Sequence, residues 1–300
     1  MKSPTPEWVR RQERSNLAIL KFMVWLSLFF GRSASRIVLY GIAVYYVIFA
    51  PQARRASRNY LRRALGRWAN WRDGFLHVFS FASTVHDRIY LLNDRFDLFD
   101  IEEHGAEQLR ATLAEGHGAL LIGAHMGSFE VLRAIGRGRE GLKVAMMMYE
   151  ENARKINATL EAINPAATKD IIGLGQPGSM IAARDKLDQG YLVGMLADRR
   201  LGDDVTTPID FLGAPAPFPV GPFRVAAMLK RPVFFMTGLY MGGNRDQIHF
   251  DRLADFTQVE RAERDDAIHA AQQAYADRLS HFCRQAPYNW FNFFDFWQDK

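Results

Sequence analysis

The sequence predicts an α/β fold with a mixed, mostly parallel central sheet flanked by helices, preceded by an amino-terminal helical segment. Two observations support this prediction. From about residue 103, helical periodicity alternates with short apolar runs, which is the pattern of parallel α/β units. Residues 1–72 instead combine apolar stretches with many arginines. We therefore expect a membrane-associated helical region at 1–72 and an α/β domain at 73–300.

Charge is distributed unevenly along the 300 residues, which carry a formal net charge of +5. Residues 1–72 contain 14 basic and two acidic residues, for a net charge of +12, whereas the rest of the chain has a net charge of −7. A basic, apolar segment favours contact with anionic lipid on the cytoplasmic side of a membrane. Nucleic acid is the alternative partner of a basic patch, but no groove-reading motif supports it.

The basic region contains two apolar stretches, Leu17–Phe30 and Ile37–Ala50. Each is shorter than the roughly 18–20 apolar residues that a spanning helix prefers. A signal peptide is disfavoured because the apolar pattern resumes at once and the arginines of 54–72 would have to cross the membrane. We expect helices associated with the inner membrane, and the sequence leaves open whether one of them spans it.

The remaining elements follow from periodicity and from turn residues. The expected helices are 52–72, Phe75–Leu91, Glu103–Glu115, Ser128–Gly136, Asn152–Ile163, Met180–Asp188, one opened by Pro219–Pro222, and Val259–Arg284. The expected strands are Ala119–Ala124, Leu142–Tyr149, Tyr191–Ala197, Pro232–Tyr240 and Gln247–Leu253, with a turn-rich passage at Asp94–Ile101 leading to a short strand. Ile209–Phe218 is interpreted as a structured loop. The aromatic segment Tyr288–Trp297 is either an edge that contacts the membrane or a strap over the core, and the strap is the default interpretation.

The stretch Ala119–Glu130 carries the strongest chemical signal. His125 lies where a buried strand ends, and histidine is the side chain whose ordinary pKa suits proton transfer near neutral pH. Glu130 is five residues further on, across a turn formed by Gly127 and Ser128, from which the chain can fold the carboxylate back onto the imidazole. The alternative is a buried structural histidine and a glutamate that caps its helix. The position at a strand end favours a catalytic pair.

These residues resemble the His-x4-Asp/Glu box of glycerolipid-type acyltransferases, and most closely the branch that contains the lipid A late acyltransferases. The resemblance extends over nearly the whole chain. The supporting stretches are Trp8–Arg14, Gly31–Arg32, Tyr60–Arg63, Leu196–Arg199, Phe211–Pro215, Pro219–Pro222 and Tyr288–Asn292.

The resemblance implies a membrane-associated O-acyltransferase with an acyl-carrier-protein thioester as donor and a lipid or glycolipid hydroxyl as acceptor. His125 would be the general base, oriented by Glu130, and the oxyanion donors would be backbone N–H groups near Gly127 and Ser128 or an arginine. This chemistry needs no metal and no organic cofactor.

The expected substrate-binding residues come partly from the resemblance and partly from charge at a strand end. They are Arg154, Asn157, Asp198, Arg199, Arg200, Phe211, Gly213 and Arg224. An arginine at the end of the 191–197 strand suits a phosphate group, because its guanidinium binds in a bidentate manner. The lipid A enzymes usually have Asp-Gln where this chain has Asp198-Arg199, so the sequence does not fix lipid A as the acceptor.

Two other functions remain as alternatives. One is a non-catalytic membrane-associated binding or scaffold protein on the same fold, against which the intact pair of His125 and Glu130 argues. The other is a dinucleotide-dependent oxidoreductase, suggested by the G-x-G-x-x-G match at Gly173–Gly178. Pro177 lies where that motif needs a backbone N–H, and a turn with Ser179 as the N-cap of the next helix explains the same residues.

Overall fold

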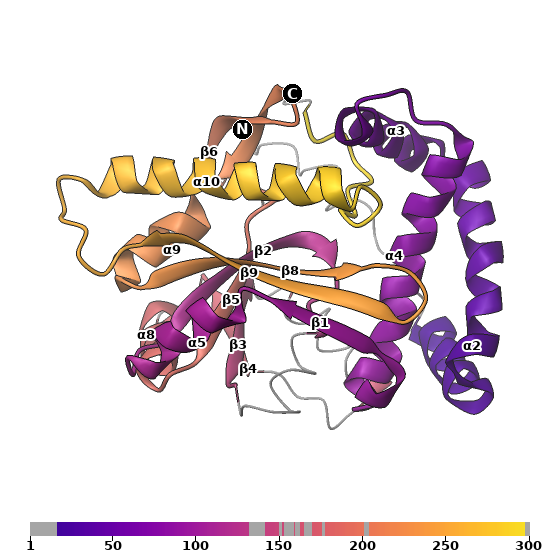
Figure 1. Cartoon of the computed structure of the whole chain (residues 1–300), viewed down its shortest axis with the longest axis horizontal. Helices are drawn as coiled ribbons and strands as arrows, with labels where there is room; N and C mark the ends of the chain where they lie inside the picture. Colours follow the sequence, from indigo (N-terminus) through magenta and orange to yellow (C-terminus); the bar gives the residue numbers. More distant parts are fainter. Residues whose placement is uncertain are drawn as a thin grey trace.

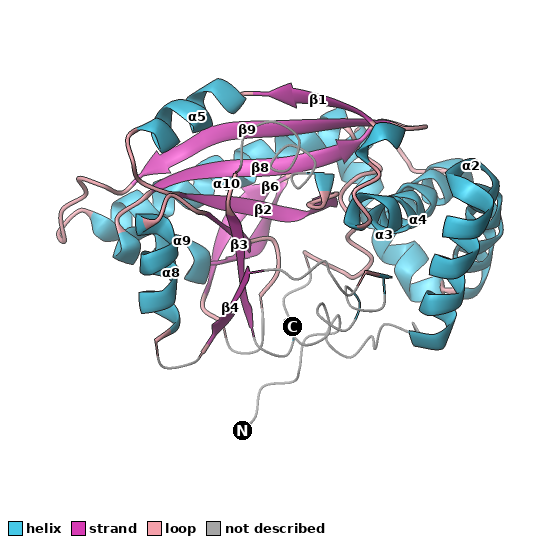
Figure 2. Cartoon of the chain, turned by 90° about the horizontal axis from the view of Figure 1, so that it is seen from below, coloured by secondary structure: helices cyan, strands magenta, loops and turns pink. Residues whose placement is uncertain are grey.

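The computed structural model describes residues 17–131, 142–149, 152, 159, 163–164, 170–175, 178–200 and 204–297. Within these residues the α/β prediction is confirmed. A seven-stranded sheet has the order β1-β9-β8-β2-β5-β3-β4 and is mostly parallel (Figures 1 and 2). Strands β8 and β9 pair antiparallel, and β1 runs parallel to β9, so the sheet is mixed at this edge.

The elements have the following bounds. The strands of the main sheet are β1 Asp100–His104, β2 Ala119–Gly127, β3 Val144–Tyr149, β4 Asp170–Leu174, β5 Leu192–Leu196, β8 Pro232–Tyr240 and β9 Arg245–Asp255, and the separate hairpin is β6 Thr206–Phe211 with β7 Ala214–Pro219. The helices are α2 Leu17–Phe49, α3 Pro51–Leu65, α4 Trp71–Leu92, α5 Ala106–Ala114, α8 Ser179–Asp188, α9 Gly221–Leu229 and α10 Arg264–Gln285, with a 3-10 turn at Phe96–Leu98.

Side chains of the central strands alternate between two cores, one on each face of the sheet. In β2, Leu120 and Ile122 pack into the core that includes residues of α8, α9 and α10. Ala119 and Leu121 point the other way and pack with Leu109 of α5. Because both faces are covered, the strand is apolar at every position up to Ala124, which is why the sequence showed a continuous apolar run there.

The amino-terminal helices lie beyond the carboxyl ends of β2 and β8, and α2 forms the outer edge of the molecule with α4 between it and the sheet (Figures 1 and 2). The backbone of α2 is non-helical at Gly31, whose φ of 80° separates the two apolar stretches seen in the sequence. Within the described residues, no single helix is long and apolar enough to cross a membrane. One pair, Met23–Phe49 and Pro51–Leu65, meets the length and composition together but is bent by 96°.

Buried charges join α2 to α4 and to the β8–β9 hairpin. Arg32 of α2 binds both carboxylate oxygens of Asp87 on α4 through two hydrogen bonds of 2.8 Å. Arg36, one turn later, lies 3.4 Å from the same carboxylate and donates to the hydroxyl of Tyr240 at the end of β8. Asp246 of β9 is buried beside this cluster. Helices α2 and α4 are therefore joined by ion pairs, and a hydrogen bond from Arg36 connects α2 to the end of β8.

Several expectations about single elements were wrong. Ile209–Phe218 is not a loop, because most of it belongs to the β6–β7 hairpin, with Leu212 and Gly213 at its turn. Both turn residues have positive φ, 50° and 81°, as a type I′ hairpin turn requires. Residues 103–104 belong to β1, so the helix expected from Glu103 begins only at Ala106.

Two further helix starts differ from the prediction. Ser179 is the first residue of α8 rather than its N-cap, and its hydroxyl donates to the carbonyl of Gly173. The last helix begins at Arg264, five residues later than expected. Most of the helix predicted at Asn152–Ile163 and most of Ser128–Gly136 lie outside the described residues. Nothing tests the boundary at residue 72, which stays a prediction.

The buried Asp246 predicts a pH dependence of stability. Burial, with a smaller contribution from the charge of Asp87, raises the pKa of Asp246 to about 7. The charges of Arg32 and Arg36 act in the opposite direction and only partly offset this increase. A pKa above the ordinary 3.8 means that the folded state holds this proton more tightly. The contribution to stability is full below pH 3.8 and is lost as the pH rises through 7. We expect Asp246→Asn to remove a loss of up to about 3 kcal/mol between pH 5 and 8, measured by urea denaturation.

The matched control is Asp97→Asn, because Asp97 is exposed and its pKa is lowered, so that it titrates below this range of pH. The Asp97 variant should keep the slope of the unfolding free energy against pH that the wild type shows. A slope that is unchanged by Asp246→Asn would contradict the prediction.

Candidate active site

The register between β2 and β5 brings His125 and Asp198 together. The two strands run parallel, and the last pair between them joins Gly123 to Leu196. His125 and Asp198 each follow two residues after that pair. They therefore lie side by side at the carboxyl edge of the sheet, where α/β folds place their functional groups. The sequence had suggested that His125 lies where the strand ends. Strand β2 continues through Gly127, so His125 is within the strand.

Asp198 binds His125 at two points. Its Oδ1 is 2.9 Å from Nδ1 of the imidazole, and its Oδ2 accepts the backbone N–H of His125 at 3.0 Å. The Asp198 side chain is fully buried, whereas 35% of the His125 side chain is exposed. An ionised carboxylate can only accept, so the bond assigns the imidazole proton to Nδ1 and leaves the lone pair on Nε2. The histidine is thus prepared to accept a proton at Nε2.

The charge of Asp198 is maintained in spite of its burial. Burial by itself raises the pKa of this carboxyl group. The charge and hydrogen bond of His125, the charge of Arg199 and the indole N–H of Trp290 outweigh that effect and hold the pKa well below its usual range. Asp198 therefore stays ionised at neutral pH and stabilises an imidazolium at His125, which is the role of the third group in a catalytic triad.

The carboxy-terminal segment completes the edge of β2 that β5 leaves open. Trp290 forms an antiparallel bridge with Met126, the amide of Phe291 donates to the carbonyl of His125 at 2.8 Å, and the amide of Gly127 donates to the carbonyl of Asn289 at 2.9 Å. Trp290 and Asn289 are buried. The aromatic segment is a strap over the core, as the sequence predicted, and it also fixes the backbone on either side of His125.

Gly127 has the left-handed backbone that the turn after His125 requires. Its φ is +60°, and a Cβ there would lie 1.8 Å from the carbonyl oxygen of Gly238. The amides of Gly127 and Ser128 donate to the carbonyls of Asn289 and Gly238, at 2.9 and 2.7 Å. These two N–H groups are already engaged, so in this geometry they are not available to an oxyanion. Their observed part is the turn, and the oxyanion donor has to come from another group.

Glu130 lies in the same region but makes a different contact. The side chain is buried, and its Oε1 is 3.7 Å from Nε of Arg88 on α4. The sequence predicted that Glu130 orients the imidazole, whereas the carboxylate found on Nδ1 is that of Asp198. Asp198 had been expected to bind substrate. In the structure its side chain is completely buried and binds His125. The catalytic role of Glu130 stays a prediction.

The other expected binding residues are only partly brought together. Arg199 donates to the carbonyl of Phe291 at 2.9 Å and lies over the ring of Phe294, so the strap holds its guanidinium. Arg200 follows it and is partly exposed. Their grip on an anionic substrate group stays a prediction. Arg154 and Asn157 lie outside the described residues.

Phe211, Gly213 and Arg224 lie on the hairpin and on α9. Phe211 is fully buried and packs edge-to-face on Trp290, with 5.1 Å between ring centroids, so it supports the strap from behind. Gly213 is in the hairpin turn, and Arg224 is exposed on α9. The N-cap of α9, Val220, donates its backbone N–H to the carbonyl of Val205. No contact within the described part of the chain joins Arg224 to His125.

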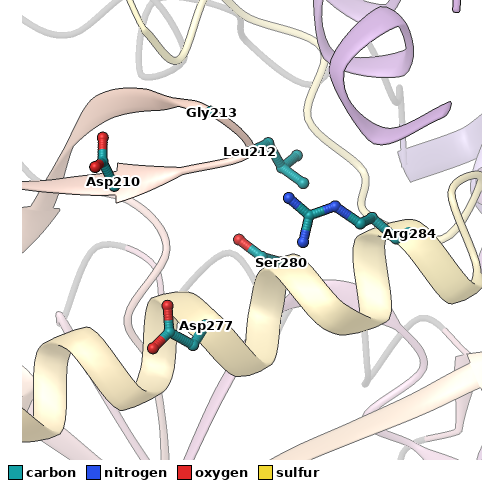
Figure 3. A pocket seen from close by; sticks show the side chains of 6 residues that line it. All are labelled: Asp210, Leu212, Gly213, Asp277, Ser280 and Arg284. Carbon is teal, nitrogen blue, oxygen red and sulfur yellow. The ribbon is translucent and has the colours of Figure 1, made fainter. Parts of the chain in front are cut away.

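A polar hollow of about 380 Å³ lies between the hairpin turn and α10 (Figure 3). Its lining includes Asp210, Gly213, Asp277 and Arg284. Neither His125 nor Asp198 contributes to it. The hollow is therefore separate from the candidate active site.

The profile of the bacterial lipid A biosynthesis acyltransferase family matches residues 11–299. The chain belongs to this family. The match covers the helical region, the sheet, the paired His125 and Asp198, and the strap, so the suspected resemblance is confirmed. Comparison with curated proteins gave no match. The glycines of the dinucleotide-like match connect β4 to α8, with Gly173 in the strand and Gly178 as the N-cap of the helix. Membership of the family favours an acyltransferase over the dinucleotide-dependent alternative.

Reasoning from sequence missed two residues of the site. Trp290 was assigned to a strap, with no contact to the acyltransferase site foreseen, although a tryptophan next to two asparagines does combine apolar bulk with a polar donor. Arg88 was not singled out, because it lies in a helix that is recognised mainly by its aromatic residues. Its signal is the run His86-Asp87-Arg88, which places three titratable groups in a helix that is otherwise largely apolar or uncharged.

The crowding at Gly127 predicts a strong effect of a single methyl group. Gly127→Ala should destabilise the protein by about 3 kcal/mol or more, because the new Cβ meets the backbone of β8 and φ is unfavourable for alanine. Gly213→Ala is the matched control, since its φ is +81° but nothing lies within 4 Å of the new Cβ. It should cost about 1 kcal/mol. Urea denaturation measures the free energy of unfolding of both variants. Equal losses of stability would contradict the prediction, because they would show that the backbone around position 127 moves to make room for the new Cβ.

Proposed function

We propose that this protein is a membrane-associated O-acyltransferase that transfers a fatty acyl group from an acyl-carrier-protein thioester to a hydroxyl of a lipid or glycolipid. Membership of the family supports a lipid acyltransferase. The single observation that supports the mechanism is the hydrogen bond between Asp198 and Nδ1 of His125, because it leaves Nε2 ready to accept a proton.

In the proposed reaction, Nε2 of His125 removes the proton from the acceptor hydroxyl. The freed oxygen attacks the thioester carbonyl carbon, a C–O bond forms, and the C–S bond breaks. The imidazolium returns its proton to the departing thiolate, so that the products are the ester and the free thiol. Asp198 stabilises the imidazolium between the two proton transfers. No covalent bond to the enzyme is formed.

The exposed apolar side chains of α2 support attachment to a bilayer. From Trp25 to Phe49 they are Trp25, Leu28, Phe29, Phe30, Ile37, Val38, Tyr40, Val44, Tyr45, Tyr46, Ile48 and Phe49. An exposed apolar surface of this extent on a globular protein is typical of an interaction site. The adjoining helix α3 contains no acidic residue and exposes arginines, which are Arg54, Arg55, Arg58 and Arg62.

We infer that α2 lies in the membrane interface and that the arginines of α3 contact anionic head groups. Both helices lie beyond the end of the sheet at which His125 is found (Figure 1). Attachment through them brings the active site close to a lipid acceptor. The positive charge of the helical region also suits an acidic carrier protein and an inner-membrane, cytoplasmic location.

The mechanism predicts that His125 and Asp198 act as a unit. His125→Gln should lower the rate of transfer of labelled acyl groups from an acyl-carrier-protein thioester into a bacterial lipid extract by about 10⁴-fold or more, to a residual rate. Asp198→Asn should lower kcat by about 10²–10⁴-fold, because the orienting and stabilising carboxylate is lost. The double variant should be no worse than His125→Gln alone. Transfer at the wild-type rate in His125→Gln would show that the histidine is structural.

Glu130→Gln tests the second carboxylate in the same assay. If Glu130 acts through His125, as the sequence predicts, then the change lowers the rate in the wild type and has no further effect in His125→Gln. If its part is only to bind Arg88, the losses from the two variants multiply. Folding of each variant is checked by its denaturation midpoint.

Membrane attachment predicts a localised effect of apolar substitutions. Replacing Phe29, Ile37 and Phe49, which are 70%, 71% and 67% exposed, by serine should weaken binding to phosphatidylglycerol-containing vesicles by at least about 100-fold. Co-sedimentation measures the binding.

The control is a triple serine variant of exposed apolar residues outside the helical region, namely Val205, Ile181 and Met228. It should bind like the wild type. Equal binding by both triple variants would show that α2 does not carry the attachment.

A further inference from the structure

Trp290 is the third donor to the carboxylate of Asp198. Its indole Nε1–H donates to Oδ2 at a distance of 3.0 Å, and the same oxygen accepts the backbone N–H of His125. Oδ1 is then left to the imidazole. The Trp290 side chain is 1% exposed, so it does not reach a substrate. The contact through which the indole acts on the site is therefore its hydrogen bond to Asp198.

The backbone of Trp290 is held by the helical layer. Nε2 of His77 on α4 lies 2.8 Å from the Trp290 carbonyl, and Nδ1 lies 2.7 Å from the hydroxyl of Ser57 on α3. Burial lowers the pKa of His77 to about 4, against a smaller opposing effect of the hydrogen bond to Trp290, so the ring is neutral. A carbonyl only accepts, so Nε2–H donates to Trp290 and Nδ1 accepts from Ser57.

The indole ring is fixed from several sides by other aromatic rings. Tyr60 of α3, Phe211 of the hairpin and Phe296 of the strap all pack edge-to-face against it, with ring centroids 4.9 to 5.1 Å away. Packing of this kind leaves one orientation for the indole N–H. The donor is thus aimed at Asp198 before any substrate binds.

We propose that Trp290 is a positioning residue of the acyl-transfer site, whose indole N–H holds the Asp198 carboxylate in the orientation in which it binds His125. This inference rests on the proposed function, because it assigns Trp290 a part in the same reaction. It goes beyond that function by extending the catalytic pair to a third residue, which comes from the carboxy-terminal strap.

The hydrogen bond has two consequences for His125. It prevents rotation of the carboxylate. Without this bond the carboxylate has two donors in place of three and no longer holds the imidazole in one position. It also disperses the negative charge of Asp198. Without it, the carboxylate attracts the imidazolium more strongly, and the neutral histidine that a general base requires forms only at a higher pH.

The test compares Trp290→Phe with Trp297→Phe. Trp297 belongs to the same aromatic cluster, but its indole donates to the backbone carbonyl of Phe211 at 3.2 Å rather than to Asp198. Trp290→Phe should lower kcat by up to about 100-fold with KM unchanged, because no substrate contact is lost. The acid limb of its profile of kcat/KM against pH should move up by about 0.5–1 pH unit. Trp297→Phe should leave both quantities as in the wild type.

A second variant separates the hydrogen bond from the packing. Incorporation of benzothienylalanine at position 290 replaces the indole N–H by sulfur and keeps the shape of the ring. It should reproduce the loss of kcat and the shift of the acid limb while leaving the denaturation midpoint close to that of the wild type. A wild-type kcat and pH profile in this variant would overturn the inference.

The two proposals fail in distinguishable ways. If the wild type shows no transfer that depends on His125, the proposed function fails. If the wild type is active and the benzothienylalanine variant behaves like it, only the role of Trp290 fails.

Discussion

One buried carboxylate determines how this edge of the molecule is built. Asp198 is fully enclosed and must remain charged, so three donors surround it, from the His125 ring, the His125 backbone and Trp290. A charge without such partners would be lost on burial, because the group would take up a proton instead. The requirement therefore binds together three segments that are far apart in the sequence, namely the ends of β2 and β5 and the carboxy-terminal strap.

The need for the strap follows from the unequal lengths of two neighbouring strands. Strand β5 ends at Leu196, whereas β2 continues to Gly127 and leaves an open row of backbone groups. The strap satisfies that row, and α3 and α4 in turn hold the strap through Tyr60, whose hydroxyl donates to the Pro287 carbonyl at 2.8 Å, and through His77. Helices α3 and α4 and the strap are thus structural supports of the active site.

The sequence predicted those features that depend on short stretches. Apolar runs gave the strands β2, β5 and β8 within a few residues, and the position of His125 near the carboxyl end of a strand was recognisable. The register of β2 against β5 was not, and it is the register that selects Asp198 rather than Glu130 as the partner of Nδ1. The loop expected at Ile209–Phe218 became a hairpin, because the prolines that suggested a loop are tolerated in a two-stranded sheet in which both strands are edges.

The same limits explain how the helical region was interpreted. Its composition indicated an apolar surface, and the exposed face of α2 agrees with that interpretation. Composition gave no sign that Arg32 and Arg36 turn inward to Asp87 instead of facing a lipid head group. The two arginines between the apolar stretches therefore form ion pairs inside the protein, whereas most of the arginines of α3 are exposed. The inward pair fixes the angle of α2 against α4 and the end of β8, so the apolar face is presented on a rigid support at the edge of the sheet where His125 lies.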